Sequence, residues 1–399
     1  MSLQVALTRR CSVFSPRVVN SSHGTGVQII NLIEAYRPNV LAFNFGISEP
    51  FWDDKAKHLE SYVASAWPLN RTGRRFWFGF CQKLGISFWK GDSLSRRGKR
   101  VVEWLGDELG NDRIMVILAS ESDARRWLAI HQLIRKPFDV ILYDLVSLES
   151  PSARTLPHLS EAICHAQQVL TISPALSEAV VAMGRDDSRR IGFYRRTPIG
   201  YSAFRLYAQR LDQRQKIHVL VMAYAHPEAL EELFSTLEAL NTTNPIWNVH
   251  LVGRIPLPSR LSPPPDWIHT YGRVSDLKRD EIAASCDLAY LSGPSDDPTK
   301  CPYAKYSVPS KISDFLTFGL PVIARVSSGS GVEQFLRNEL GNIACVATDR
   351  NELTKLLSSL QDSPEMVWEM RSCALNKARE DVLLPDAANW LFAGARSDP

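Results

Sequence analysis

The sequence predicts an α/β protein with two domains, each built on a parallel sheet. Three observations lead to this prediction. The chain has 399 residues, too many for one compact core. Short apolar runs alternate with helical patterns in both halves, which is typical of βαβ units. Hydrophobic residues make up 45% of the chain and charged residues 22%, the balance of an ordinary globular protein.

Composition excludes several classes of protein. The net charge of +3 does not imply a nucleic-acid partner, and we expect none. The seven cysteines are scattered and include no Cys-x-x-Cys pair, which favours reduced thiols. The nine histidines show no ligand spacing, so no metal site is predicted. No run approaches the ~20 apolar residues of a membrane span, and the apolar run at 5–7 is too short for a signal peptide. We therefore expect a cytoplasmic protein, at most peripheral on the cytoplasmic membrane face.

In the first half, strands are expected at 3–7, 40–45, 113–119, 138–143 and 168–172. A helix through 124–134 separates the third strand from the fourth. Ser173 should cap the next helix, because Pro174 fits its first position. The charged segment 205–216 is expected to link the domains.

Two features of this half are candidates for ligand contact. The glycine-rich turn at 21–26 precedes a helical segment, which is the usual place for a ligand in doubly wound proteins. It lacks the full Gly-x-Gly-x-x-Gly pattern, since Ile29 stands at the third position, and a tight turn explains its glycines about equally well. Asp144 follows the strand at 138–143, where it either contacts a ligand or caps the next helix.

A basic and aromatic segment lies at 71–100. It holds nine basic residues and one acid, Asp92, interleaved with six aromatic residues. Such a mixture suits an interfacial segment on anionic lipid headgroups. A solvated basic helix whose aromatic side chains face the core explains it slightly better. Single-stranded nucleic acid would need a similar mixture, but nothing else in the chain supports that partner.

The second half repeats the βαβ rhythm and predicts a second parallel sheet. Strands are expected at 217–225, 247–252, 268–274 and 287–291, and helices at 227–240, 276–286, 352–360 and 366–379. A polar loop at 292–306 follows the strand at 287–291.

The stretch at 308–334 organises this half. Ile312, Phe315 and Phe318 are spaced for one helix face, Gly319 can cap that helix, and Pro321 prevents its continuation. A buried strand at 321–324 should follow. The turn at 327–331 then leads into a helix, and its small residues expose backbone amides that suit a phosphate or diphosphate.

Lys311 and Asp314 lie three residues apart on the first helix of this stretch. A cation for phosphate and a carboxylate for ribose hydroxyls would be a functional pair. An isolated Lys-x-x-Asp is more often a nearly neutral surface ion pair. The strand, turn and helix around it favour the functional interpretation.

The segment P-S-K-I-S-D-F-L-T-F-G-L-P-V-I at 309–323 resembles the donor-binding signature of GT-B glycosyltransferases, in particular the retaining group with a Glu-x7-Glu motif. The resemblance extends over most of the second half. It implies two Rossmann-like domains whose parallel sheets face each other across a cleft: an acceptor-side domain at 1–210, a donor-binding domain at 217–380, and a tail at 381–399 that packs back on the first domain.

The resemblance also implies an activity. The protein would be a hexosyltransferase-like enzyme, retaining and metal-independent, with a nucleotide-diphosphate sugar as co-substrate and no other cofactor. Its acceptor would be a glycan or a lipid-linked molecule of cell-surface polysaccharide or glycolipid biosynthesis. The segment at 71–100 would then meet an anionic membrane.

Candidate site residues follow from the resemblance and the local patterns. His23 and Asp144 are the catalytic candidates on the acceptor side, and Gly24, Thr25 and Gly26 form the acceptor and phosphate loop. The donor-binding candidates are Arg254, Arg273, Ser292, Pro294, Ser295, Tyr306, Ser310, Lys311, Asp314, Ser328, Gly329, Ser330, Gly331 and Glu333.

The family pattern fails at two places. Asp314 stands at the second motif glutamate, but Tyr306 stands at the first. The family's Arg/Lys pair after the first donor-domain strand is also missing, since residues 224–227 read Y-A-H-P. Phosphate binding would then depend on Lys311, Arg254 or Arg273. Two alternatives stay open: a non-catalytic homologue that binds a nucleotide sugar or a partner enzyme, and a nucleotide-sugar epimerase.

Overall fold

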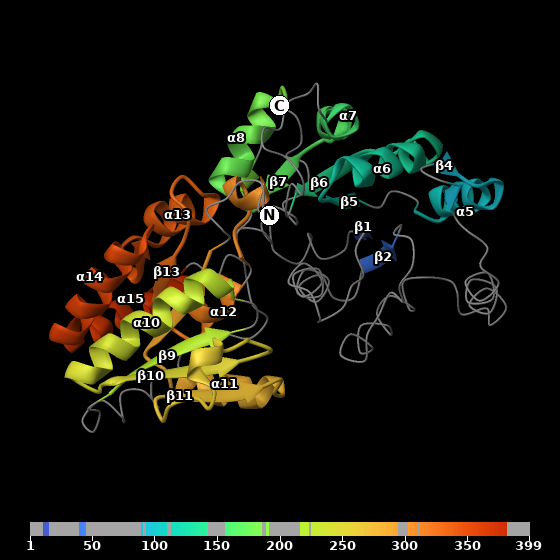
Figure 1. The fold of residues 1–399 in the computed structure, drawn as a ribbon. Coiled ribbons are helices and arrows are strands. Elements are labelled where there is room, and N and C mark those ends of the chain that lie inside the picture. The colour runs from blue at the N-terminus through green and yellow to red at the C-terminus, as the bar shows by residue number, and fades with distance from the viewer. Residues whose placement is uncertain are drawn as a thin grey trace. The chain divides into compact units, whose positions relative to one another are not determined.

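The computed structural model describes residues 11–15, 40–44, 89–90, 93–109, 113–142, 156–185, 189–190, 216–222, 225–293, 302–309 and 311–380. The chain divides into two compact units, Met1–Gly192 with Leu383–Pro399, and Phe193–Val382. In each unit, helices pack against a parallel sheet (Figure 1). The predicted α/β class with two parallel sheets is confirmed. The expected docking of 381–399 concerns residues outside the described ranges and stays a prediction.

The first unit contains a parallel sheet with strand order β2-β1-β5-β6-β7-β8. Its strands are β1 Cys11–Ser15, β2 Val40–Asn44, β5 Arg113–Leu118, β6 Phe138–Leu142, β7 Val169–Thr171 and β8 Arg189–Arg190. Its helices are α5 Arg96–Glu108, α6 Glu121–Ile134, α7 Pro157–His165 and α8 Pro174–Ala182, and a hairpin pairs β3 Trp89–Lys90 with β4 Ser93–Leu94. Ser173 caps α8 as predicted, since its side chain accepts a hydrogen bond from the Leu176 amide at 3.1 Å.

β1 was not predicted from the sequence. The strand expected at 3–7 lies outside the described residues. β1 carries two serines, yet it pairs with β2 on one side and β5 on the other. Phe14 of β1 is fully buried and packs edge-on against Trp127 of α6 at a ring distance of 5.1 Å. Pairing on both sides satisfies the backbone of β1, and Phe14 adds a buried apolar contact.

The second unit contains a six-stranded parallel sheet with strand order β11-β10-β9-β12-β13-β14. Its strands are β9 Ile217–Met222, β10 Trp247–Val252, β11 Ile268–Gly272, β12 Leu288–Ser292, β13 Val322–Arg325 and β14 Ala344–Ala347. Numbered along the chain this is the order 3-2-1-4-5-6, the arrangement of doubly wound nucleotide-binding sheets. The order therefore reverses between β9 and β12. The sequence analysis did not predict β14.

The helices of this unit agree with the predicted segments. They are α10 Pro227–Thr243, α11 Asp276–Ala284, α12 Lys311–Thr317, α13 Gly331–Phe335, α14 Arg350–Asp362 and α15 Pro364–Glu380. Short 3-10 turns lie at Ser259–Leu261, Pro302–Lys305 and Gly341–Ile343, and a π-turn at Leu336–Leu340 follows α13. None of the described helices has the length and hydrophobicity of a membrane span.

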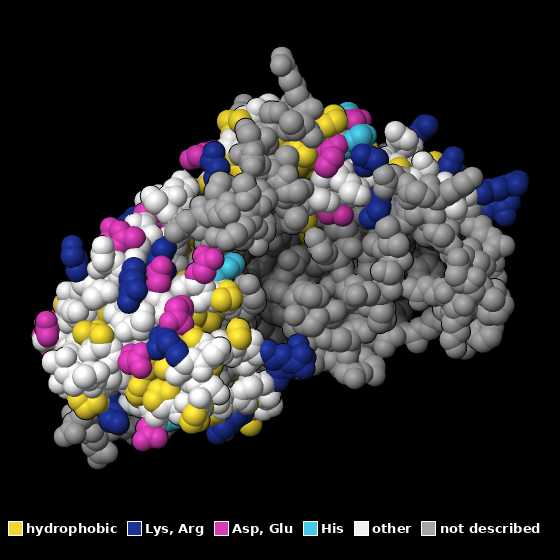
Figure 2. Space-filling model, viewed as in Figure 1, with side chains coloured by type: hydrophobic (Ala, Val, Ile, Leu, Met, Phe, Trp, Pro, Cys, Tyr) yellow, Lys and Arg dark blue, Asp and Glu magenta, His cyan; other side chains and the backbone are white. Residues whose placement is uncertain are grey.

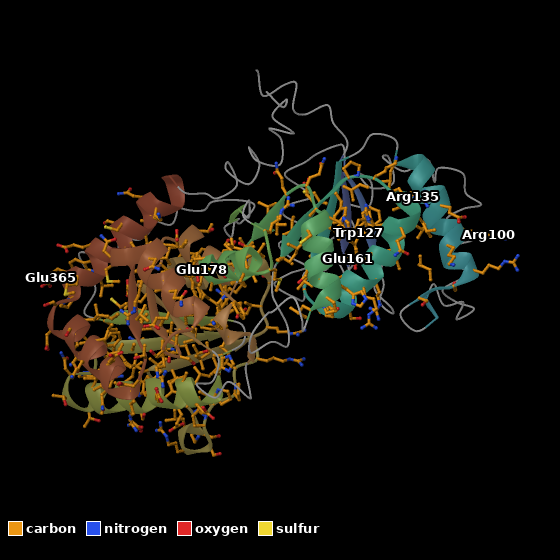
Figure 3. The ribbon with its side chains drawn as sticks, turned by 90° about the horizontal axis from the view of Figure 1, so that it is seen from above. Arg100, Trp127, Arg135, Glu161, Glu178 and Glu365 are labelled. Atoms are coloured by element: carbon orange, nitrogen blue, oxygen red, sulfur yellow. The ribbon has the colours of Figure 1, made fainter. Side chains whose placement is uncertain are left out.

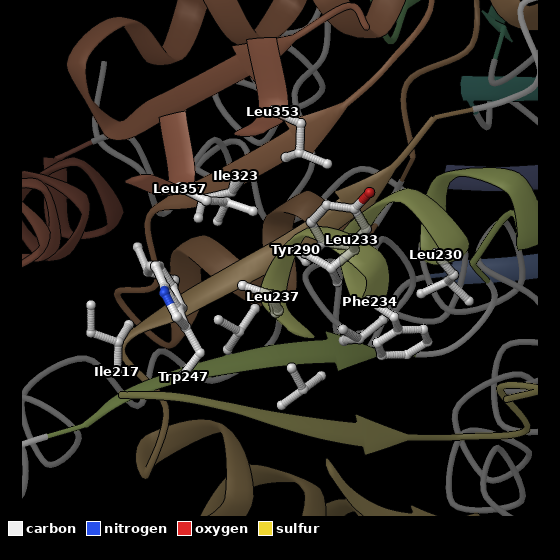
Figure 4. Close-up of a cluster of buried hydrophobic side chains, with 14 of the residues drawn as sticks. Ile217, Leu230, Leu233, Phe234, Leu237, Trp247, Tyr290, Ile323, Leu353 and Leu357 are labelled. Carbon is white, nitrogen blue, oxygen red and sulfur yellow. The ribbon is translucent and has the colours of Figure 1, made fainter. Parts of the chain in front are cut away.

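One face of the second sheet packs against α10 and α14 (Figure 4). Trp247 and Tyr290 contribute large side chains from the strands, and Leu233, Leu237 and Leu353 meet them from the helices. The polar atoms of both aromatic side chains are bonded: the Trp247 indole donates to Gln361 Oε1 at 2.8 Å, and the Tyr290 hydroxyl donates to the Ala229 carbonyl at 2.7 Å. Burial of such apolar area is the main stabilising contribution to this unit.

The helix predicted at the start of 308–334 is α12. Ile312, Phe315 and Phe318 are fully buried, as their spacing predicts. Gly319 ends the helix with φ +64°, the left-handed conformation that glycine adopts without strain. A Cβ atom there would lie 2.1 Å from the Leu375 side chain. Glycine is therefore required both for the backbone conformation and for the contact with α15.

Candidate functional site

The strongest candidate site is the carboxyl edge of the second sheet between β9 and β12. In open α/β sheets, ligands bind outside the carboxyl ends of the strands where the strand order reverses. Three described groups come together here: His226, which follows β9, Ser292 at the end of β12, and Lys311 at the start of α12.

The backbone amide of His226 donates a hydrogen bond to Ser292 Oγ at 2.8 Å. His226 is also the N-cap residue of α10, and Pro227 follows at the first helical position. The positive end of the α10 dipole is thus directed at this edge. Ser292 is buried, so its hydroxyl holds the start of α10 against the end of β12.

Two potential cations share this edge. Lys311 is half-buried, and burial lowers the pKa of its ammonium group to about 8. The pKa of His226 is lowered as well, first by burial and then by the positive charge of Lys311, while Glu228 acts in the opposite direction. Burial and like charge both disfavour the charged forms. A bound anion would remove this penalty, which makes the edge suited to a negatively charged ligand.

Gly293 follows Ser292 at the end of β12 and packs closely against the next strand. Its amide donates to the Arg325 carbonyl at 2.7 Å. A Cβ atom on Gly293 would lie 2.9 Å from the Val326 Cα, so no side chain fits there without backbone movement. The predicted donor residues Pro294, Ser295 and Ser310 lie outside the described residues.

In the predicted anion-binding turn at 327–331, the carboxylate of Glu333 takes the place expected for an anion. Ser330 caps α13 by accepting from the Glu333 amide at 3.2 Å. The Gly329 amide donates to Glu333 Oε2 at 2.7 Å, and Arg337 Nε donates to Glu333 Oε1 at 3.0 Å. Gly329 has φ +73°, a conformation that favours glycine. A phosphate at this turn would have to compete with the Glu333 carboxylate. Ser328 is exposed beside it.

The turn packs against another predicted donor loop. A Cβ atom on Gly331 would lie 2.6 Å from the Lys305 carbonyl oxygen, so glycine permits this close approach. Tyr306 follows directly and is only 3% exposed, which leaves little of its ring available to a ligand in this structure. Its predicted contact with a sugar remains a prediction.

The other predicted donor residues lie near the same edge of the second sheet. Asp314 is half-buried on α12, and Arg254 and Arg273 are exposed just beyond the ends of β10 and β11. Figure 2 shows basic and acidic side chains interspersed over the visible surface of this unit. The face in view therefore carries no large field of one sign.

The acceptor-side predictions concern residues that the structure does not describe. They are His23, Gly24, Thr25, Gly26 and Asp144. Among the described residues, the carboxyl edge of the first sheet presents Glu121 at the start of α6. Glu121 Oε1 accepts from the His158 amide at 3.0 Å and lies 2.5 Å from His158 Nδ1, and Oε2 accepts from the Leu159 amide at 2.9 Å. The sequence analysis missed this link between α6 and α7, since no local pattern joins residues 37 positions apart.

The basic segment at 71–100 is described only at 89–90 and 93–100. Arg96, Lys99 and Arg100 of α5 are exposed and Val102 of the same helix is buried. Arg100 extends away from the ribbon (Figure 3). This is an amphipathic helix with a basic outer face, which agrees with both the interfacial and the solvated interpretation. Within the described ranges, no group of three or more His, Cys, Asp or Glu residues is arranged to hold a metal ion.

Comparison with known proteins identifies the fold. No family model and no curated protein matches the sequence. Among solved structures, HepE of Anabaena in complex with UDP aligns with a TM-score of 0.65 at 16% identity, covering 96% of this chain and 100% of HepE. Sucrose-phosphate synthase of Thermosynechococcus elongatus aligns with a TM-score of 0.58 at 13% identity, covering 97% and 100%. The chain has a GT-B fold.

The same fold also matches a protein named as a UDP-N-acetylglucosamine 2-epimerase from Listeria monocytogenes, with a TM-score of 0.54 at 12% identity and 98% coverage of both chains. The predicted GT-B architecture is therefore confirmed. At these identities the likeness concerns the fold alone and does not choose between sugar transfer and epimerisation.

Proposed function

We propose that this GT-B protein is a glycosyltransferase that takes its sugar from a nucleotide-diphosphate donor. The observation that carries the proposal is the placement of His226, bonded to Ser292, and of Lys311 at the strand-order reversal of the second sheet. A diphosphate is the kind of anion that a lysine ammonium group, a histidine that can take up a proton, and a helix N-terminus attract. Structures of the neighbour HepE include complexes with UDP and with UDP-glucose, which supports a nucleotide-sugar ligand for this fold.

The reaction breaks the bond between the anomeric carbon and a diphosphate oxygen, and negative charge develops on the leaving diphosphate. Lys311 would stabilise that charge, helped by the N-terminus of α10. The half-buried carboxylate of Asp314 would accept hydrogen bonds from the ribose hydroxyls. With these groups the leaving charge is offset by protein cations and dipoles, so we propose a metal-independent reaction in which positioning and electrostatics supply most of the catalysis.

The proposal also covers the stereochemistry, the pathway, the acceptor and the location of the reaction. We propose a retaining transferase of cell-surface polysaccharide or glycolipid biosynthesis, acting on a glycan or lipid-linked acceptor at the cytoplasmic membrane face. The exposed basic face of α5 supports an anionic lipid surface. Flotation with anionic vesicles at low salt tests it, because electrostatic attraction is strongest there. Failure to float with the vesicles would exclude the membrane contact.

The first experiment measures thermal stability against UDP-, GDP-, ADP- and TDP-sugars. A ligand at 100-fold its dissociation constant should add about 2.7 kcal/mol of apparent stability. We expect one nucleotide class to stabilise the protein and Lys311→Gln to lose that effect. Lys355→Gln is the matched control, since Lys355 is exposed on α14. If no nucleotide sugar stabilises the wild-type protein, the donor proposal fails.

Two other functions keep specific support. Tyr306 at the first motif position favours a homologue that binds a nucleotide sugar without catalysis, and the Listeria protein named as an epimerase has the same fold, which is compatible with an epimerase. Incubating the stabilising donor without any acceptor separates these cases. Inversion of one sugar carbon indicates an epimerase. An unchanged donor, together with no transfer to any glycan or lipid tested, indicates the binding protein.

A further inference from the structure

His226 is part of the candidate donor site, although the sequence analysis did not name it among the candidate donor-binding residues. Its backbone is held by the hydrogen bond to Ser292 Oγ at 2.8 Å, and the following proline starts a helix of 17 residues. The imidazole itself does not cap α10. The fold therefore places His226 at the carboxyl edge of the sheet without using its imidazole as a helix cap.

The charges that act on this imidazole come from two elements. Lys311 of α12 repels a proton on His226, and Glu228 of α10 attracts one. Burial and the Lys311 charge together outweigh Glu228, so the pKa of His226 is below its usual value. At neutral pH the ligand-free site therefore holds a neutral His226 beside a largely charged Lys311, whose own pKa is about 8.

We propose that a nucleotide-diphosphate sugar binds at this edge together with a proton, which His226 takes up. This inference rests on the function proposed above. The diphosphate of such a donor is esterified at both ends and carries two negative charges. Of Lys311 and His226, one would be positively charged in the empty site and both in the occupied site. Proton uptake would thus add one positive charge beside the two negative charges of the ligand.

The sign of the pH dependence follows from linkage. An adjacent anion favours the charged form of a histidine and raises its pKa. Between the ligand-free and the ligand-bound pKa, the complex holds more protons than its separate components. The dissociation constant should therefore rise with pH, by up to about tenfold per pH unit. Lys311 should add a second uptake near pH 8 and above, so the histidine is best observed between pH 6 and 7.5.

Isothermal titration calorimetry on the full-length protein tests the proposal. UDP-glucose is the first probe, or whichever nucleotide sugar stabilises the protein most, because its diphosphate does not titrate in this range. Titrations at pH 7 in two buffers of different ionisation enthalpy give the number of protons taken up. We expect uptake of a fraction of one proton in the wild-type protein and in His165→Asn, since His165 is 59% exposed on α7 of the first unit. In His226→Asn we expect the uptake to fall to the small contribution of Lys311, on the order of a tenth of a proton at pH 7.

A second measurement does not depend on binding by the variant. In a two-dimensional NMR spectrum of the histidine rings, the signal that is missing from His226→Asn identifies His226. In the wild-type protein at pH 7, that signal should move to the imidazolium position when UDP-glucose is added. Circular dichroism checks that the variant is folded, so that the missing signal does not result from unfolding.

The outcomes separate the two proposals. If no nucleotide sugar binds the wild-type protein, the proposed function fails and this inference fails with it. Binding without proton uptake overturns only the inference. Uptake that persists at the wild-type level in His226→Asn, or a His226 signal that stays neutral when ligand is bound, assigns the proton to another group and also overturns it.

Discussion

The amide of His226 and the hydroxyl of Ser292 form a hydrogen bond of 2.8 Å between groups that are 66 residues apart in the sequence. The bond joins the end of β12 to the start of α10. It lies where the strand order of the second sheet reverses, the place where doubly wound proteins bind their ligands. The candidate donor site is therefore built around a tertiary contact.

Replacement of Ser292 by alanine should weaken both the fold and the site. The His226 amide would lose its buried partner, which costs about 1 to 3 kcal/mol. Urea denaturation should show this loss, and calorimetry should show weaker nucleotide-sugar binding. Ser359→Ala is the control, because Ser359 is exposed on α14 and donates only to its own helix. Equal stabilities of the two variants would mean that the bond does not hold the start of α10.

Lys311→Met should make the ligand-free protein more stable at pH 7. The pKa of Lys311 in the folded protein is about 8, against 10.5 for an unperturbed lysine. Below pH 8 both states are protonated, so folding includes the whole cost of burying the charge. Between pH 8 and 10.5 the unfolded state binds more protons, so the stability of the wild-type protein rises with pH relative to the variant.

Denaturation of both proteins at pH 7 and at pH 9.5 measures this effect. The variant should exceed the wild-type free energy of unfolding by about 1 to 3 kcal/mol at pH 7, and the difference should shrink at pH 9.5. The same variant should lose nucleotide-sugar binding, a stability gained at the expense of function. A variant that is less stable than the wild type at pH 7 would contradict the buried-charge interpretation.

Glu333→Gln should strengthen the binding of a diphosphate ligand. Glu333 Oε2 accepts from the Gly329 amide at 2.7 Å, and a glutamine oxygen can accept the same bond. The substitution therefore keeps the turn and removes one negative charge from the predicted anion site. We expect affinity to rise about two- to fivefold, the effect of one partly screened charge.

Calorimetry with the stabilising nucleotide sugar checks this, and Glu365→Gln is the control, because Glu365 is exposed on α15 (Figure 3). An unchanged affinity would indicate that the diphosphate is held at Lys311 and His226 without the turn at 327–331.

Glu121→Ala should destabilise the first unit. Its carboxylate accepts from the His158 and Leu159 amides and contacts the His158 ring, so one side chain holds the start of α7 on α6. Loss of these charge-assisted bonds should cost about 2 to 4 kcal/mol. Glu161→Ala on α7 should change stability by less than about 0.5 kcal/mol, since Glu161 is 52% exposed. Thermal unfolding of the two variants compares them, and equal midpoints would mean that Glu121 is not structural.

Much of the second unit could be predicted from local patterns. The spacing of Ile312, Phe315 and Phe318 predicted α12, because a buried helix face needs apolar residues at that spacing. Gly319 predicted the end of the helix, because glycine adopts positive φ without strain. β1 was missed for the opposite reason. Its burial comes from pairing with β2 and β5 and from the contact with Trp127, none of which shows in the residues at 11–15.

The sequence by itself determined the α/β rhythm, the helix caps and the lysine at the start of α12. The period of hydrophobic residues and the backbone constraints of glycine and proline act over a few residues. These features can therefore be predicted from short stretches of sequence. Only the tertiary structure decided that the His226 amide donates to Ser292, that the charge of Lys311 acts on His226, and that the Gly329 amide donates to Glu333. Strand order and the electrostatics of burial depend on groups far apart in the chain, and the pKa values of Lys311 and His226 shift only once folding has buried them.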